Sequence, residues 1–184
     1  ALVGIVKIPA QDVVKMYKSQ ASDIFTKNTF GALSLLGKRT SKYSSAGIEG
    51  VVKAHVGSRR MDEKHDPKPL VSVVSKLEQS QAVDQSPAFL FRNYDFIALG
   101  ERRKHGTCTC TMLDASLATS AAPTYFPPRH VEVAGQMKEF KDGGLVANNP
   151  TLEAVHEVMA LWPDTPIDVI VSCGCGLQPP ETHP

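Results

Sequence analysis

Apolar residues recur at steps of three and four over two stretches near the start of the chain, which is the spacing of helices with one buried face. The first predicted helix covers Ala10 to Phe25 and follows Pro9, where proline is tolerated. Its apolar stripe consists of Val13, Met16, Tyr17, Ala21 and Ile24. A second, shorter helix begins near Ile48 and ends at Gly57. Residues 28–45, between the two, are rich in Lys, Ser, Thr and Gly, and we interpret them as irregular.

Two further helices are predicted in the second half of the chain. Met112 to Ser120 has helical character and stops before Ala122-Pro123, because a residue that precedes proline avoids the helical region. Asn149 suits a helix cap, with Pro150 at the first helical position. The residues expected to form the buried stripe of this last helix are Leu152, Val155, Met159 and Trp162.

Three apolar, β-branched runs predict strands. Two are short, Leu70 to Val74 and Ala88 to Tyr94. The third, Ile167 to Ser172, is an unbroken apolar run of the kind found in a parallel sheet that is covered on both faces. The loops predicted from charge, proline and polar residues are 58–68, 79–87, 101–106 and 126–129. This order of helices and strands predicts an α/β fold.

The composition is that of an ordinary soluble globular domain, with 42% hydrophobic and 21% charged residues among 184. A formal net charge of +1 creates no global field, so we expect no nucleic-acid partner and only a local membrane contact. No apolar run approaches the roughly 20 residues that cross a bilayer. The basic run Arg102-Arg103-Lys104 is a candidate for lipid head groups, although a solvated turn is the simpler interpretation.

The four cysteines form two close pairs, Cys108/Cys110 and Cys173/Cys175. A disulfide framework normally spreads its cysteines along a small, loop-rich chain, so we expect reduced thiols and an intracellular protein. Structural zinc sites favour wider spacings than one intervening residue, so these pairs are poor zinc ligands. We therefore predict cysteines that are buried in strands.

The segment Asp142-Gly143-Gly144 is the strongest candidate for chemistry. Alone, Asp-Gly signals a turn. The functional interpretation is a carboxylate at a strand end, beside a backbone that two glycines keep open, where it accepts a proton from a hydroxyl nucleophile. Upstream, Ser120 to Phe126 (SAAPTYF) combines small residues with a Pro-aromatic turn, which lets two elements pack closely.

Taken together, SAAPTYFPP and DGGLVANNPTLEAVHE resemble the C-terminal half of the patatin-like phospholipases. FLFRNYDF (89–96) and LWPDTPIDVIVS (161–172) are similar to the calcium-independent phospholipases A2 of the gamma type within that family. The resemblance covers essentially all of residues 1–184 and is weakest between residues 28 and 85. It implies a three-layer α/β fold with a central, mostly parallel sheet flanked by helices. It also implies a phospholipid substrate, peripheral contact with an intracellular membrane, and no metal or organic cofactor.

The resemblance further implies a Ser–Asp dyad. The family's base is the Asp of its D-G-G/A turn, so Asp142 is the expected proton acceptor, with Gly143 and Gly144 completing the motif. The family's nucleophile is the Ser of a G-x-S-x-G elbow, and a glycine-rich loop supplies its oxyanion hole; the 184 residues contain neither. The chain begins with Ala1 inside a stretch that resembles the helix after the elbow. We therefore expect the serine upstream of Ala1, and no activity from the isolated stretch.

Two alternatives remain open. A catalytically inactive patatin-like module that binds lipid or a protein partner would carry the same motifs. A Ser–His–Asp esterase of another α/β fold would need a histidine beside the Asp. The six histidines are His55, His65, His105, His130, His156 and His183. Only His156 falls beside a predicted apolar helix face, so a catalytic histidine is not favoured.

Overall fold

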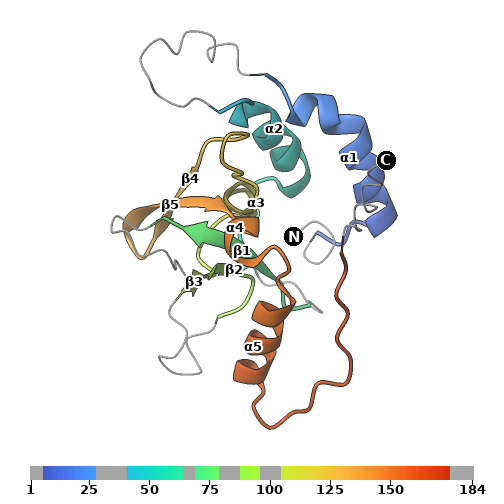
Figure 1. The fold of residues 1–184 in the computed structure, drawn as a ribbon, viewed down its shortest axis with the longest axis vertical. Coiled ribbons are helices and arrows are strands. Elements are labelled where there is room, and N and C mark those ends of the chain that lie inside the picture. The colour runs from blue at the N-terminus through green and yellow to red at the C-terminus, as the bar shows by residue number, and fades with distance from the viewer. Residues whose placement is uncertain (1–5, 28–40, 64–68, 79–87, 96–104, 175–184) are drawn as a thin grey trace, which may run out of the picture. The chain divides into compact units, whose positions relative to one another are not determined.

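The computed structural model describes residues 6–27, 41–63, 69–78, 88–95 and 105–174 (Figure 1). The chain divides into two compact units, residues 1–148 and residues 149–184. The helices of the larger unit are α1 (Ala10–Ile24), α2 (Ser45–Val56), α3 (Met112–Thr119) and α4 (Gly144–Ala147). Its strands are β1 (Ser72–Leu77), β2 (Ala88–Arg92), β3 (Gly106–Thr107), β4 (Arg129–Val133) and β5 (Gln136–Asp142). The smaller unit contains α5 (Thr151–Leu161).

The strands of the larger unit form one five-stranded sheet in the order β3-β2-β1-β5-β4. The central strand β1 runs antiparallel to β2 on one side and to β5 on the other, and β4 pairs antiparallel with β5. A sheet flanked by helices confirms the predicted α/β class (Figure 1). The strand directions are mixed rather than mostly parallel, with β2 and β3 as the parallel pair among the described strands.

Three phenylalanines form the centre of the core. Phe89 and Phe91 of β2 and Phe140 of β5 have ring centroids 4.9, 5.0 and 5.1 Å apart, and all three are buried. The register places Phe91 opposite Val73 and Phe140 opposite Leu77, so the rings share one face of the sheet. The α3 side chains that join this core are Met112, Ala115 and Ala118. The two alanines are fully buried, and their small size lets α3 lie close to the sheet.

The helix predictions for the larger unit are confirmed with small shifts in their ends. The first helix ends one residue earlier than predicted, and in its predicted apolar stripe Ile24 is buried while Tyr17 is 57% exposed. α2 starts earlier than predicted because the Ser44 hydroxyl caps it, accepting a hydrogen bond of 3.2 Å from the Ala46 nitrogen. It ends at Gly57 as predicted, where φ is 61°. The third helix ends at Thr119, also one residue early.

The helices stack outward from the sheet, because α3 packs on β1, β4 and β5, α2 packs on α3, and α1 packs on α2. Gly47 makes the last contact close: a Cβ at this position would lie 2.0 Å from the Asp23 carbonyl oxygen. A second apolar cluster joins the three helices to the loop that follows them. Its buried members are Ile24, Ile48, Leu117 and Phe126.

The β4–β5 hairpin was not predicted, and its first residue fell in the predicted 126–129 loop. Its alternation is visible in retrospect, since Val131 and Val133 are buried while their neighbours are polar. The two turn residues, Ala134 and Gly135, both have positive φ, 52° and 75°. Such a two-residue turn matches the twist of a hairpin, but Ala is an unusual first residue for it. Because the turn contains no Asn-Gly or Asp-Gly pair, the sequence did not indicate it.

The first two strand predictions are confirmed in part. β1 overlaps the predicted strand from Ser72 and runs on to Leu77, where the alternating polar residues Ser75 and Lys76 had concealed it. β2 starts at the predicted residue and ends two residues early. The predicted loop 79–87 and residues 101–104 of the predicted loop 101–106 lie outside the described residues, and Gly106 at the end of that loop instead begins β3.

The predicted strand Ile167 to Ser172 is wrong for this structure. The segment has no regular secondary structure and is exposed, with Val169 at 75% and Val171 at 77% of full accessibility. A strand needs a neighbour for its backbone hydrogen bonds, and no described strand pairs with this segment. The apolar composition was therefore correctly noted but did not by itself determine the conformation.

The last helix, α5, is confirmed, while the predicted burial of its stripe is wrong. Asn149 contributes to the helix start as predicted, because its Oδ1 accepts a hydrogen bond of 3.1 Å from the Thr151 nitrogen. Three of the four residues expected to be buried are instead exposed: Leu152 at 61%, Met159 at 59% and Trp162 at 47%.

Candidate functional site

Asp142 is the last residue of β5, so the structure has this carboxylate at a strand end, as the sequence predicted. It pairs with Ser75 on the central strand. Its backbone nitrogen donates a hydrogen bond of 3.0 Å to the carbonyl oxygen of Ala121, in the SAAP segment. The two motifs singled out from the sequence, DGG and SAAP, are therefore in direct contact.

Gly143 passes so close to the central strand that no side chain fits. A Cβ there would lie 2.2 Å from the carbonyl oxygen of Val74, which is far inside van der Waals contact. The Gly143 nitrogen donates a hydrogen bond of 3.3 Å to the carbonyl oxygen of Thr119, at the end of α3. Glycine is therefore required here because the backbone passes close to β1. Its φ does not require glycine, since −65° is accessible to any residue.

Gly144 meets a different constraint. Its nitrogen donates a hydrogen bond of 2.7 Å to Asp142 Oδ1, which fixes the carboxylate against its own turn. A Cβ on Gly144 would lie 3.0 Å from that same oxygen, a side-chain atom that is able to shift. No residue in the described ranges donates to the second carboxylate oxygen, Asp142 Oδ2. One oxygen thus orients the group, while the other is available to a hydroxyl donor.

Two buried or half-buried hydroxyls hold α3 against the strand that neighbours Asp142. Ser75 Oγ lies 2.7 Å from the carbonyl oxygen of Lys141 and 3.2 Å from that of Ala118, and shares its proton between them. Thr119 Oγ1 donates a hydrogen bond of 2.6 Å to the carbonyl oxygen of Val74. Sequence reasoning missed both residues, because nothing in the sequence distinguishes a serine that donates to the backbone from a solvated one.

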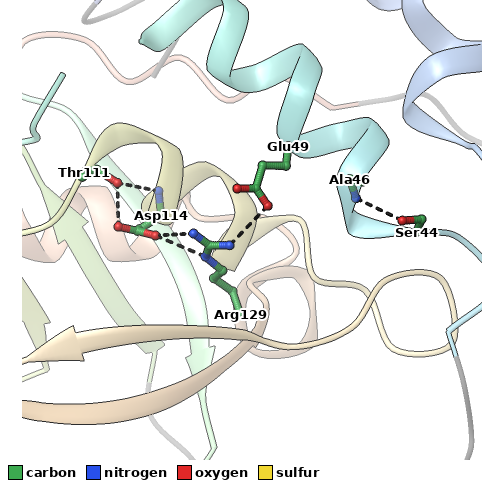
Figure 2. Close-up of polar contacts among 6 residues, drawn as sticks. All are labelled: Ser44, Ala46, Glu49, Thr111, Asp114 and Arg129. Atoms are coloured by element: carbon green, nitrogen blue, oxygen red, sulfur yellow. Dashed lines mark hydrogen bonds and ion pairs between the residues drawn. The ribbon is translucent and has the colours of Figure 1, made fainter. Parts of the chain in front are cut away.

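An ion-pair network holds the other end of α3 (Figure 2). Thr111 caps the helix and bonds Asp114 twice, accepting from its nitrogen at 3.0 Å and donating to its Oδ2 at 2.6 Å. Arg129 of β4 donates from Nε and Nη2 to Asp114 Oδ1 at 3.2 and 2.7 Å, and its Nη1 lies 3.6 Å from Glu49 of α2. One guanidinium thus joins α2, α3 and the hairpin that ends at Asp142.

An apolar cavity of about 170 Å³ lies among α1, α2, α3 and β1, beside the turn that carries Asp142. Its connection to the site runs through Thr119, which lines the cavity and accepts the hydrogen bond from Gly143. The apolar lining residues are Met16, Tyr17, Ile24, Ile48, Val51, Val52 and Val73. The remaining lining residues are polar: Gln20, His55, Ser116, Thr119 and Ser120.

The three described histidines of the larger unit, His55, His105 and His130, do not form a triad with Asp142. His55 Nδ1 lies 2.8 Å from the carbonyl oxygen of Val51 within α2, and His130 lies 3.5 Å from Glu139 on the hairpin. His105 is exposed. None of these three forms a described hydrogen bond with the Asp142 side chain, whose Oδ1 accepts from the Gly144 nitrogen. His65 and His183 lie outside the described residues.

The cysteines contribute neither a nucleophile nor a metal site to this turn. Burial raises the pKa of Cys110 to about 12, and burial followed by the charge of Asp95 raises the pKa of Cys108, so both stay protonated thiols at neutral pH. Both are free, as expected, but they lie in a bend after β3 rather than in a strand. Cys173 is exposed, so the prediction of burial is wrong there, and Cys175 lies outside the described residues.

Two negative findings concern only the described residues. Their His, Cys, Asp and Glu side chains form no group of three or more suited to holding a metal ion. Their helices include none whose length and apolar content would let it cross a bilayer. The candidate basic run Arg102-Arg103-Lys104 lies outside the described residues.

Comparisons with known proteins identify the family to which this chain belongs. A family profile described as patatin-like phospholipase matches residues 2–155, which include the SAAP and DGG segments. Calcium-independent phospholipase A2-gamma from Rattus norvegicus is 36% identical over 178 residues, which are 95% of this chain and 22% of the relative. Its Homo sapiens counterpart is 33% identical over 177 residues, with the same shares of each chain covered.

A plant relative matches a shorter stretch. Phospholipase A I from Arabidopsis thaliana is 43% identical over 74 residues, which are 40% of this chain and 5% of that protein. The chain thus spans about a fifth of the length of the gamma-type relatives that it matches and a smaller share of the plant protein.

Proposed function

Because this chain belongs to the patatin-like phospholipase family, we propose that it forms part of a lipid acyl hydrolase whose general base is Asp142. The substrate is a glycerophospholipid, and the reaction hydrolyses one of its fatty-acyl esters. The nucleophile is a serine on a polypeptide segment that is not among these 184 residues, since they contain no G-x-S-x-G elbow. The observation that carries the proposal is the turn of Asp142, which fixes one carboxylate oxygen and leaves the other available.

The proposed reaction has two halves. In the first, Asp142 takes the proton of the serine hydroxyl while the serine oxygen attacks the ester carbonyl. The tetrahedral intermediate collapses to an acyl-serine, and the leaving alcohol of the lysophospholipid takes the proton from Asp142. In the second half, Asp142 takes a proton from water, whose oxygen attacks the acyl-serine. Release of the fatty acid returns the proton to the serine.

The surroundings of Asp142 support this role. A base must hold its position relative to the nucleophile, and hydrogen bonds to Ala121 and Thr119 restrain the backbone on both sides of the carboxylate. The apolar cavity that borders Thr119 suits the acyl chain of the substrate, because burying methylene groups is favourable while the ester stays near the carboxylate. We further propose that the protein acts at the surface of an intracellular membrane, where its substrate resides, and that it has no nucleic-acid partner.

The test is the Asp142→Asn variant of the full-length polypeptide that carries this sequence. Asn keeps the shape and the bond from Gly144 but cannot take a proton, so fatty-acid release from phosphatidylcholine vesicles should fall by roughly 10²–10⁴-fold. Asp12→Asn is the matched control, because Asp12 is a partly exposed residue of α1 that pairs with Lys15 on the same helix. Activity of Asp142→Asn within twofold of wild type would contradict the assignment.

The alternative function is an inactive lipid-binding or interaction module. Its motivation is the missing elbow, since these residues supply an acid without a nucleophile. It predicts vesicle binding without release of fatty acid from the full-length polypeptide. The same assay on the wild-type protein therefore separates the two functions before any variant is made.

A further inference from the structure

Three stretches of chain meet just beyond the C-terminal end of α1. The backbone joins them, because the Tyr43 nitrogen donates to the Tyr125 carbonyl oxygen at 2.9 Å, and the Lys42 nitrogen donates to the Thr124 carbonyl oxygen at 2.7 Å. Tyr43 also forms an isolated antiparallel bridge with Lys27, just beyond α1. We call the side chains that project here the aromatic knuckle. Its members are Phe25, Lys42, Tyr43 and Tyr125.

The rings of the knuckle are layered from buried to exposed. Phe126, 8% exposed, lies beneath them with its centroid 6.0 Å from Phe25 and 5.9 Å from Tyr43. Above it, Phe25 meets Tyr43 edge-on at 5.2 Å, and Tyr43 stacks on Tyr125 at 6.0 Å. The outer rings reach solvent, with Phe25 44% and Tyr125 48% exposed. Among the described phenylalanines, Phe25 alone is exposed.

Two exposed lysines, Lys27 and Lys42, accompany these rings. The Lys42 ammonium lies 5.3 Å from the Tyr43 ring and 5.8 Å from the Tyr125 ring, which keeps an exposed cation at the aromatic surface. The described residues 24–27, 41–45 and 115–131, which supply the knuckle and its flanks, contain no Asp or Glu. Arg129 is paired with both Asp114 and Glu49, so the two lysines are the cations that face the exposed acid Asp23.

We propose that the aromatic knuckle docks the protein on an anionic phospholipid surface. The inference rests on the proposed function, and it names the surface through which the enzyme reaches its substrate. Tyrosine rings suit the membrane interface, with an apolar body facing the lipid and a hydroxyl facing water. An exposed phenylalanine gains from leaving water, and each cation near an anionic surface strengthens binding about fivefold.

Backbone hydrogen bonds connect the knuckle to the turn that carries Asp142. The Tyr125 and Phe126 nitrogens both donate to the carbonyl oxygen of Ala122, at 3.1 and 2.9 Å. The preceding residue, Ala121, accepts the hydrogen bond from the Asp142 nitrogen. A short, hydrogen-bonded turn therefore links the docking rings to the backbone that holds the carboxylate. Docking through these rings keeps Asp142 beside the lipid surface, where an acyl ester is within reach.

The test uses full-length variants and sedimentation with vesicles of phosphatidylcholine alone or with roughly one-third phosphatidylserine. For Phe25→Ser/Tyr125→Ser, the dissociation constant for phosphatidylserine vesicles should rise at least about tenfold. For Lys42→Gln it should rise about fivefold on those vesicles and change little on pure phosphatidylcholine. The controls are Met137→Ser and Lys53→Gln, an exposed apolar residue on β5 and an exposed cation on α2, and both should bind as wild type.

Single variants keep the test decisive if the double variant fails to fold, because Tyr125→Ser and Lys42→Gln each leave the buried Phe126 in place. Unchanged vesicle binding by folded knuckle variants overturns the proposal, as does an equal loss by Lys42→Gln on neutral and anionic vesicles. If a partner protein binds the wild type but not these variants, while vesicle binding is unchanged, the knuckle is a protein interface instead. Asp142→Asn should still bind vesicles normally, so failure of docking is distinguishable from failure of the catalytic assignment.

Discussion

The backbone nitrogen of Asp142 donates a hydrogen bond of 3.0 Å to the carbonyl oxygen of Ala121. These residues are 21 positions apart and belong to different motifs, one following a strand and the other following a helix. The adjacent bond from Gly143 to Thr119 reinforces the contact. The carboxylate is thus held between β5 and the end of α3, and predictions about it concern both elements.

The first prediction is that Gly143 cannot carry a side chain. Gly143→Ala places a methyl group 2.2 Å from the Val74 carbonyl oxygen, so the turn must shift away from the central strand. We expect the free energy of unfolding to fall by about 1–3 kcal/mol and lipid hydrolysis to be largely lost. Gly144→Ala is the matched control, because its new methyl group meets side-chain atoms of Asp142 and Asn148 and no backbone atom within 4 Å. Equal stability of the two variants in urea denaturation would refute the close-approach argument.

The second prediction concerns Ser75, whose hydroxyl donates to two backbone carbonyl oxygens and has no role in the proposed reaction. Ser75→Ala leaves the carbonyls of Lys141 and Ala118 without this donor, so the free energy of unfolding should fall by about 1–3 kcal/mol. Ser72→Ala, on the same strand and without a described hydrogen bond from its side chain, should be close to neutral. Thermal and urea unfolding of the two variants provides the comparison.

The third prediction is that Arg129 stabilises the fold through partly exposed charge pairs. Its side chain is 28% exposed and that of Asp114 is 22%, so solvent screens the attraction. Arg129→Gln should lower the free energy of unfolding by about 1 kcal/mol, and the difference should shrink at high salt. Arg59→Gln, an exposed residue at the end of α2, should have little effect. A difference for Arg129→Gln that is independent of salt would indicate packing rather than charge.

The fourth prediction separates the cysteines by reactivity. Alkylation requires a thiolate, and the pKa of about 12 for buried Cys110 keeps this group protonated well above neutral pH. Iodoacetamide at about pH 8 should therefore modify exposed Cys173 rapidly and Cys110 only after unfolding. Peptide mass spectrometry with and without urea measures both sites, and rapid labelling of Cys110 in the native protein would contradict the structure.

Sequence patterns located the helices and the key turn more reliably than the sheet. The stripe that includes Met16 and Ile24 and the helix end at Gly57 are local features, so periodicity and chemistry suffice to define them. Strand pairing depends on distant partners. For that reason the hairpin that ends at Asp142 was missed, and the apolar run that begins at Ile167 was assigned a pairing that it does not have in this structure.

The residues of the candidate site also differ in whether the sequence could predict them. Asp142 could be singled out because its Asp-Gly-Gly turn, together with the SAAP segment, resembles a known motif, whereas the residues that hold it in place could not. Ser75 and Thr119 act through backbone carbonyls that are far away in the sequence. The knuckle likewise depends on the contact between Tyr43 and Tyr125, which only the fold brings together.

The most direct test of the central claim is the labelling of the missing nucleophile. A fluorophosphonate forms a covalent bond with a serine whose proton is removed by an adjacent base. In the full-length polypeptide, we predict that one serine outside these 184 residues is labelled, and that Asp142→Asn slows its labelling at least about 100-fold. Labelling of Asp142→Asn at the wild-type rate, with the fold intact, would contradict the role of Asp142 as the base.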